Sequence, residues 1–171
     1  MSRFRFEPAF SHDRAGRLGV LLVNLGTPDA PTPAAVRRYL AEFLIDPRVV
    51  EIPRLAWLPI LYAFVLTTRP ARSAKKYGLI WHKDGSPLLL HSMKQRSLLQ
   101  GLLGQRLKTL GLPPELVQVE LAMRYGNPDV AGAIDRLRAA GCDRVLVLPL
   151  YPQYAASTTA SALDAVYESA R

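Results

Sequence analysis

LGVLLVNLGTP, residues 18–28, sets the class of fold. It is a short apolar run that ends in a Gly-Thr-Pro turn, a pattern typical of a strand buried in a parallel sheet. Two further runs of this kind follow at residues 116–123 and 144–148, and Pro149 ends the second. The chain therefore contains at least three predicted strands, each of which runs into a turn.

Helical patterns separate these strands. Thr32 offers an N-cap with Pro33 at the first helical position, and apolar residues at i, i+3, i+4, i+7 and i+8 follow until Asp46-Pro47. Further helices are expected from Ser86-Pro87 towards Gly111, from a cap at Asn127-Pro128 to Gly141, and over Ser157–Arg171. This alternation predicts an α/β fold, a right-handed Rossmann-like three-layer sandwich around a parallel sheet.

Length and composition predict one α/β domain over residues 18–171, preceded by a flexible basic leader over residues 1–17. The net charge of +8 suits nucleic acids, anionic membranes or small polyanions. Because the basic residues are scattered rather than gathered in runs, no nucleic-acid partner is expected. The single cysteine, Cys142, and a leader without an apolar signal-peptide stretch favour a cytoplasmic location.

Ligands of open parallel sheets bind beyond the carboxyl ends of the strands. The segments there are residues 26–28, 124–128 and 151–154, which contain glycines, an arginine and three tyrosines. They include no obvious nucleophile or metal-binding cluster, and they predict a site for a large, flat, anionic molecule. Arg124, at the edge of a buried sheet, requires an anionic partner or water.

These segments also resemble the signatures of the ferrochelatases. LLVNLGTP (21–28), Tyr77 with GSPL (85–88), MRYGNP (123–128), and YPQY with STT (151–154 and 157–159) occur in the family's order. The resemblance is closest to bacterial members of the protoporphyrin type. It implies a chelatase with two similar Rossmann-like halves, of which this chain is the amino-terminal one, and a porphyrin held between them. The implied activity is that of a lyase that inserts ferrous iron, as a substrate, into protoporphyrin IX to give protoheme.

The resemblance also assigns the porphyrin-binding positions. Carried over residue by residue, they are Leu25, Tyr77, Ser86, Arg124, Tyr125, Tyr151 and Ser157. Arginine and hydroxyl donors suit the porphyrin propionates, and aromatic and aliphatic walls suit the ring. On residue chemistry alone, Tyr77 is a rim residue and Ser86 and Ser157 are helix caps, so their assignment depends on the resemblance.

The family's catalytic histidine and its acidic partner belong to the second half, and this sequence contains no matching segment. His12, His82 and His91 lie outside that motif, so no catalytic and no metal-ligating residue is assigned in this chain. The 171 residues alone are expected to be inactive and to be part of a truncated protein. Some relatives hold an iron–sulfur cluster through a cysteine at the position of Ala156, so neither a cluster nor another permanently bound cofactor is expected here.

Other functions remain open at this point. The chain fits a stand-alone porphyrin- or heme-binding module without catalysis, or a related chelatase for another metal such as cobalt. An α/β nucleotide-binding domain is disfavoured, because the first strand is not followed by G-x-G-x-x-G.

Leu55–Leu66 is an apolar segment flanked by arginines and lysines. It is shorter than the ~20 residues that span a bilayer, and a short apolar helix between cationic ends can lie in a membrane interface. The resemblance places it at the lip of the pocket mouth, so peripheral membrane contact is expected. An ordinary buried helix is the alternative.

Overall fold

The computed structural model describes residues 16–170 and contains a parallel sheet in the strand order β2-β1-β3. Its strands are β1 (Leu18–Thr27), β2 (Val117–Gly126) and β3 (Arg144–Pro149). The central strand β1 pairs in parallel with β2 from Leu18 to Thr27 and with β3 from Leu18 to Val23. The predicted α/β class and parallel sheet are therefore confirmed.

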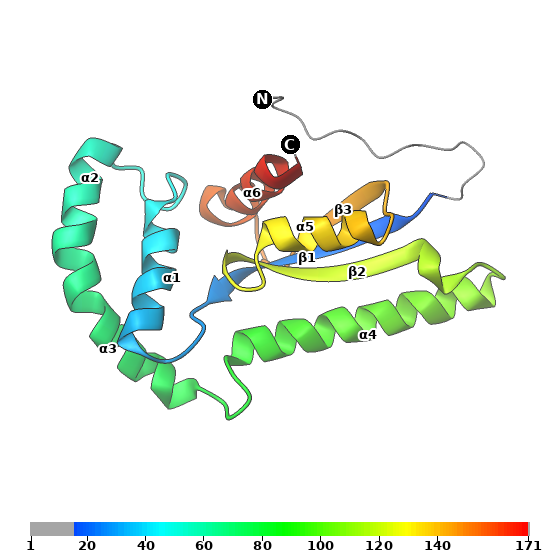
Figure 1. Ribbon diagram of the computed structural model, residues 1–171, viewed down its shortest axis with the longest axis horizontal. Coiled ribbons are helices and arrows are strands. Elements are labelled where there is room, and N and C mark those ends of the chain that lie inside the picture. The colour runs from blue at the N-terminus through cyan, green and yellow to red at the C-terminus, as the bar shows by residue number, and fades with distance from the viewer. Residues whose placement is uncertain (1–15, 171) are drawn as a thin grey trace.

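Helices cover both faces of this sheet and its carboxyl end. They are α1 (Pro33–Ile45), α2 (Arg54–Ile60), α3 (Leu66–Ile80), α4 (Pro87–Thr109), α5 (Val130–Ala139) and α6 (Ser161–Ala170). A π-helical turn over Leu61–Val65 joins α2 to α3, another over Ala156–Ala160 precedes α6, and a 3₁₀ turn over Pro114–Leu116 precedes β2. Figure 1 shows the three layers, with α4 on one face of the sheet, α5 and α6 on the other, and α1 to α3 standing beyond the carboxyl ends of the strands.

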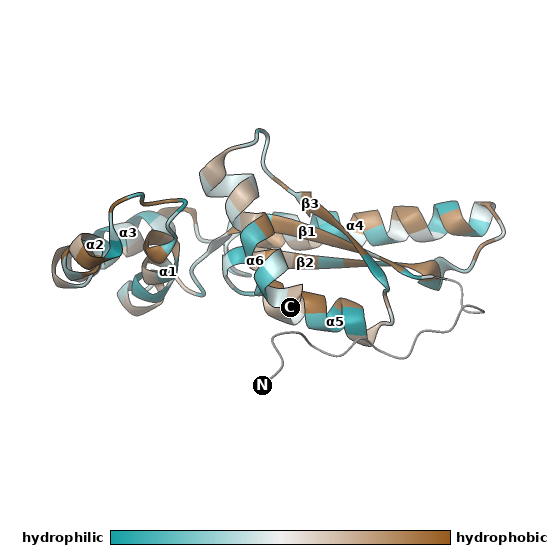
Figure 2. Cartoon of the chain, turned by 90° about the horizontal axis from the view of Figure 1, so that it is seen from above, coloured by the Kyte–Doolittle hydropathy of each residue, from teal (hydrophilic) through white to brown (hydrophobic). Residues whose placement is uncertain are grey.

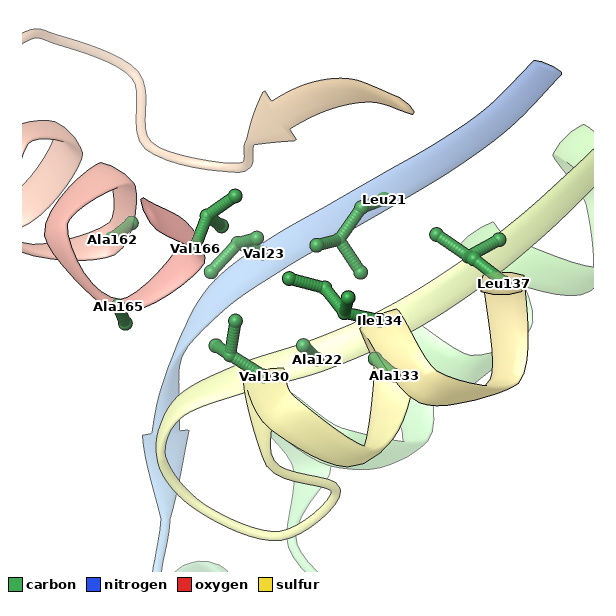
Figure 3. Close-up of a cluster of buried hydrophobic side chains, with 10 residues drawn as sticks. All are labelled: Leu21, Val23, Ala122, Val130, Ala133, Ile134, Leu137, Ala162, Ala165 and Val166. Atoms are coloured by element: carbon green, nitrogen blue, oxygen red, sulfur yellow. The ribbon is translucent and has the colours of Figure 1, made fainter. Parts of the chain in front are cut away.

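The face under α5 and α6 holds a core of small and branched apolar side chains (Figure 3). From β1 and β2 it takes Leu21, Val23 and Ala122. The two helices supply Val130, Ala133, Ile134, Leu137, Ala162, Ala165 and Val166. Because successive strand residues point to opposite faces, the intervening residues Val20 and Leu22 pack with β2 and α4 on the other side. The continuous apolar run of β1 is thus explained by burial on both faces, visible as the brown central strand in Figure 2.

The helices α1 to α3 have a small core of their own. Leu44 of α1, Leu61 of the π-helical turn and Leu66 of α3 are buried against one another. Helix α1 begins as predicted, because the Thr32 side chain accepts a hydrogen bond from the N–H of Ala35 and Pro33 is the first helical residue. This group places the end of α1 beside the carboxyl ends of β1 and β2.

Several element boundaries differ from the predictions. Helix α5 is capped by Asp129, whose side chain accepts from the N–H of Gly132, and not by Asn127-Pro128, which is a cis peptide bond in the turn before it. The last predicted helix begins as a π-helical turn, and α6 starts only at Ser161. Of the leader expected over residues 1–17, residues 1–15 lie outside the described part, whereas Arg17 donates to the carbonyl of Ala140 at 2.8 Å.

Gly26 lets the ends of β1 and β2 approach closely. Its φ is +115°, and a Cβ at this position would lie 1.9 Å from the carbonyl oxygen of Tyr125. Only glycine fits such a place, since both the backbone conformation and the space exclude a side chain. The glycine of the first motif therefore brings the two segments that carry the candidate site together.

Candidate functional site

Aromatic side chains gather where β1 and β2 end. Tyr39 of α1 is buried and donates its hydroxyl to the carbonyl of Gly26 at 3.3 Å. Its ring is stacked parallel to that of Phe43, and Phe43 meets the ring of Tyr125 edge-on with 5.1 Å between centroids. Tyr77 of α3 lies beside Tyr39 and packs edge-on against Trp81. The predicted residues Tyr77 and Tyr125 thus belong to one aromatic cluster.

The tyrosine hydroxyls of this region are neutral hydrogen-bonding groups. Burial is the main cause that raises the pKa of each of them above its ordinary value: Tyr39, Tyr77, Tyr125 and Tyr151. Charging any of them would place a phenolate in a poorly solvated site. At neutral pH they can donate or accept hydrogen bonds without carrying charge.

Asp46 is the centre of a buried polar network next to these tyrosines. Its Oδ2 accepts hydrogen bonds from the Arg124 guanidinium at 2.6 Å, the Tyr125 hydroxyl at 2.8 Å and the Ser161 hydroxyl at 2.5 Å. Its Oδ1 accepts from the backbone N–H of Arg48 at 2.7 Å. One carboxylate therefore joins the end of α1, the end of β2 and the start of α6.

This carboxylate is held in its charged form. Burial of Asp46 opposes ionisation, but the hydrogen bonds from Ser161 and from the N–H of Arg48 favour it. The Tyr125 hydroxyl and the Arg124 charge add to these, so that the pKa of Asp46 lies below its usual value. Since only 4% of the Asp46 side chain is exposed, the pair with Arg124 is a buried salt bridge.

Arg124 has the anionic partner that the sequence required, and that partner belongs to the chain itself. Besides its bond to Asp46, the guanidinium donates to Ser161 at 2.7 Å and lies 4.6 Å from the centroid of the Tyr125 ring. A fifth of the Arg124 side chain remains exposed. The charge of Arg124 is thus compensated before any ligand arrives, and its role towards a porphyrin stays a prediction.

The other predicted site residues lie at different places around this network. Ser86 is buried and accepts a hydrogen bond from the Thr27 hydroxyl at 2.8 Å, which ties the start of α4 to the end of β1. Leu25 is half-buried on β1, and Ser157 is half-buried on the π-helical turn before α6. Among residues 16–170, no side-chain hydrogen bond joins Ser157 to the network.

Sequence reasoning missed Asp46 and Ser161 as site residues and took Asp46 only as the end of a helix. The helix dipole disfavours a carboxylate at the C-terminus of a helix. The position of Asp46 at the end of α1 therefore indicates that a cation elsewhere in the chain stabilises it. Ser161 follows the fourth motif by two residues and carried no sign of its own.

Comparisons with known proteins agree with the motifs. The model of the ferrochelatase family matches residues 17–171. The chain belongs to the ferrochelatase family. It is 56% identical to the ferrochelatase of Chromobacterium violaceum over 167 residues, 98% of this chain and 44% of that protein. It is 61% identical to that of Methylibium petroleiphilum over 161 residues and 58% identical to that of Bordetella pertussis over 151 residues.

The chain spans less than half the length of these ferrochelatases. The aligned region is 42% of the Methylibium protein and 40% of the Bordetella protein, against 94% and 88% of this chain. Within residues 16–170, no three His, Cys, Asp or Glu side chains form a group that could hold a metal ion.

Proposed function

We propose that this chain forms one wall of the porphyrin site of a ferrochelatase, which inserts ferrous iron into protoporphyrin IX. Membership of the family supports the activity, and the tyrosine cluster at the carboxyl ends of β1 and β2 supports the place of the ring. Flat aromatic ligands pack well on accessible aromatic side chains, and half-buried Tyr77 is the accessible tyrosine of this cluster. A related chelatase for another metal would use the same wall, so the metal is assigned by the family alone.

The single observation that carries the proposal is the hydroxyl of Tyr151. It is buried and has no hydrogen-bond partner among residues 16–170. An unpaired buried hydroxyl costs free energy, and a ligand group that accepts its hydrogen bond after a small shift of the ring would recover that cost. A propionate or a pyrrole nitrogen of a porphyrin offers such a partner.

In the proposed mechanism, this wall grips the ring while metal enters from one face. Insertion requires loss of two pyrrole protons and exposure of nitrogen lone pairs, which a distorted ring presents better than a flat one. Tyr77, which is half-buried, is the tyrosine of this cluster that can face the ring. The buried Tyr39 and Tyr125 stiffen the wall behind it, because they pack on Phe43 and Tyr125 is bonded to Asp46. Contacts remote from the metal can then offset the strain of distortion.

The groups that remove the pyrrole protons are proposed to lie outside these 171 residues. Asp46 is ionised but is committed to Arg124, Tyr125 and Ser161, so it is a poor candidate for a base. We expect no iron insertion by the chain alone above the uncatalysed rate. Measured insertion by the purified chain would contradict this part of the proposal.

An absorbance titration with a dicarboxylic porphyrin tests the wall itself. Saturable binding should shift the main porphyrin band, and Tyr151→Phe should weaken the affinity about tenfold, the effect of one hydrogen bond to a charged group. Tyr167→Phe is the matched control, because Tyr167 is exposed on α6. Equal affinities of the wild type and Tyr151→Phe would remove the support that Tyr151 gives.

We also propose that α2 and the following π-helical turn touch a membrane surface. Leu55, Tyr62 and Phe64 are 94%, 49% and 68% exposed, although all three are apolar or aromatic. Within residues 16–170, no helix is both long and apolar enough to pass through a bilayer. Arg54 and Arg69 at the two ends suit anionic headgroups, so a helix that lies on the surface fits these side chains.

Co-sedimentation with phosphatidylcholine vesicles that contain phosphatidylglycerol tests the contact. Leu55→Ser with Phe64→Ser should reduce the bound fraction, whereas Leu98→Ser, on the exposed side of α4, should not. Trp57 is unsuitable for this test, because its indole donates to the carbonyl of Leu44 at 2.7 Å and anchors α2 to α1. Unchanged sedimentation of the double variant would exclude the contact.

A further inference from the structure

A pocket of about 440 Å³ opens at the outer edge of β2, between α4 and α5. Its apolar wall includes Leu89, Met93 and Leu121, and its polar groups include Arg96, Arg136 and Glu120. Figure 1 shows α4 running along β2 with α5 on the opposite side of the strand. None of these residues belongs to the tyrosine cluster or the Asp46 network. Size and lining are those of a small-molecule site, mostly apolar with a few fixed polar groups.

The polar groups of the pocket are fixed by one another. Glu120 accepts from Arg96 through Oε1 at 3.2 Å and from Arg136 through Oε2 at 2.9 Å. Its side chain is only 11% exposed, so the carboxylate holds both guanidinium groups in place. Burial opposes ionisation of Glu120, but the hydrogen bond from Arg136 is among the causes that keep its pKa below the usual value. Two cations face one anion, which leaves a net charge of +1.

Arg136 retains donors for a ligand. Its Nε is used by Glu120, and its terminal nitrogens have no hydrogen-bond partner among residues 16–170. Nearly half of its side chain, 47%, is exposed. Arg96 has less to offer, since its Nε donates to the carbonyl of Val119 and a terminal nitrogen donates to Glu120. A planar guanidinium with free edge N–H groups binds a carboxylate in the two-pronged manner.

We propose that this pocket binds a small apolar molecule that carries one carboxylate. The apolar body would lie on Leu89, Met93 and Leu121, and the carboxylate would pair with the free edge of Arg136. A monoanion matches the net charge of the polar groups, and the apolar lining disfavours ligands with several charges, because these would lose their hydration without compensation. The pocket shares no residue with the proposed porphyrin site.

The test uses 2-naphthoate as a probe and methyl-¹³C methionine NMR as the readout. The chain has three methionines, and Met93 lines the pocket whereas Met123 is buried in the core under α4. We expect a saturable shift of the Met93 signal. Arg136→Gln should weaken the affinity about tenfold, and 2-naphthalenemethanol, the neutral analogue, should bind correspondingly less well.

Arg138→Gln is the matched control, because Arg138 lies on the same helix and pairs with Asp135 instead. An unmoved Met93 signal, or equal binding of the acid and the alcohol, would overturn the proposal. So would an unchanged affinity in Arg136→Gln. If Arg136→Gln does not fold, Ser97→Trp tests the proposal instead. Ser97 is an exposed lining residue, so a tryptophan there should fill the mouth of the pocket and weaken binding of 2-naphthoate. Wild-type affinity in a folded Ser97→Trp would overturn the proposal as well.

Discussion

At the scale of single residues, Asp46 shows how one carboxylate can hold together side chains from several elements. Taking two charges out of water is costly, and the attraction between Asp46 and Arg124 repays that cost only because Ser161, Tyr125 and a backbone N–H also bind the carboxylate. The network is therefore sensitive to loss of any one partner. Its members come from three elements, so damage to it should be felt as a loss of tertiary structure.

Asp46→Asn should lower the free energy of unfolding by about 3 kcal/mol, because it leaves the Arg124 cation buried without a counter-ion. Urea unfolding followed by circular dichroism measures the change. Asp164→Asn is the matched control, since Asp164 pairs with Arg48 on the surface and its loss should cost much less stability than the loss of Asp46. Equal losses in the two variants would contradict the central place of Asp46.

The same carboxylate predicts a dependence on pH. The pKa of Asp46 is lower in the folded chain than its ordinary value, so its contribution is fully present above about pH 5. It is lost as the pH falls through the folded pKa, below about pH 4. Between pH 6 and 3, wild-type stability should therefore fall more steeply than that of Asp46→Asn. The pKa of Glu120 is lowered too, so Glu120 contributes to the fall in stability of both the wild type and Asp46→Asn. Parallel curves for the two proteins would show that Asp46 is not the group that titrates.

Loss of the Tyr151 hydroxyl should stabilise the folded chain, whereas loss of the Asp46 carboxylate should destabilise it. The Tyr151 hydroxyl is buried and has no hydrogen-bond partner within the described part of the chain, residues 16–170, so Tyr151→Phe should raise the free energy of unfolding by about 1 kcal/mol. Tyr125→Phe removes a hydroxyl that donates to Asp46 and should lower it. Urea unfolding of the two variants side by side separates the cases. A loss of stability in Tyr151→Phe would mean that its hydroxyl is satisfied in the chain, and the argument for a ligand at Tyr151 would fail.

At the scale of elements, the strands and the capped helices were predictable because their signals are local. The apolar runs of β1, β2 and β3 and the Thr32-Pro33 start of α1 needed no tertiary information. Helix α3 was not predicted, because Pro70 lies inside it and reads as a helix breaker. Ser86 is at the N-cap of α4 as expected, yet its side chain bonds to Thr27 rather than to the helix, a long-range choice that local patterns cannot show.

Helix α4 does more than cover a face of the sheet, since it also closes the outer edge of β2. The side chain of Gln100 donates to the carbonyl of Val117 at 3.0 Å and accepts from the N–H of Val119 at 2.7 Å. This amide takes the place of a neighbouring strand. Edges left open are sites of unwanted pairing, so the arrangement protects β2.

Gln100→Ala should therefore cost about 1–3 kcal/mol of stability, because a partly buried N–H and a carbonyl lose their partner. It should also speed hydrogen exchange at the Val119 amide, which NMR can follow directly. Gln95→Ala, at an exposed position of the same helix, is the control and should change neither quantity. Unchanged exchange at Val119 would show that Gln100 does not protect the edge.

At the scale of the whole molecule, the candidate site is built from residues that are far apart in the sequence and belong to no common motif. Asp46 and Ser161 are 115 residues apart and share a hydrogen bond, and Arg124 joins them. The motifs placed Arg124, Tyr125 and Tyr151 near the ends of the strands because parallel strands bring their carboxyl ends together. Asp46 and Ser161, which bind Arg124 and Tyr125, are brought to them only by the packing of α1 and α6 against the sheet, and this packing could not be predicted from the motifs.

The β2 edge of the sheet is covered by side chains of α4, whereas the β3 edge is exposed in the isolated chain. Gln100 and Arg96 cover the edge of β2, whereas β3 leaves Val145, Leu146 and Leu148 exposed at 42%, 48% and 38%. An exposed apolar edge strand invites pairing with another copy. Self-association of the 171-residue chain should therefore rise with concentration in sedimentation velocity experiments. Leu146→Lys should suppress it, since a charge on an edge strand opposes pairing, whereas Leu98→Lys on α4 should not. A chain that stays monomeric at every concentration, or an equal effect of both substitutions, would show that the β3 edge is not the surface responsible.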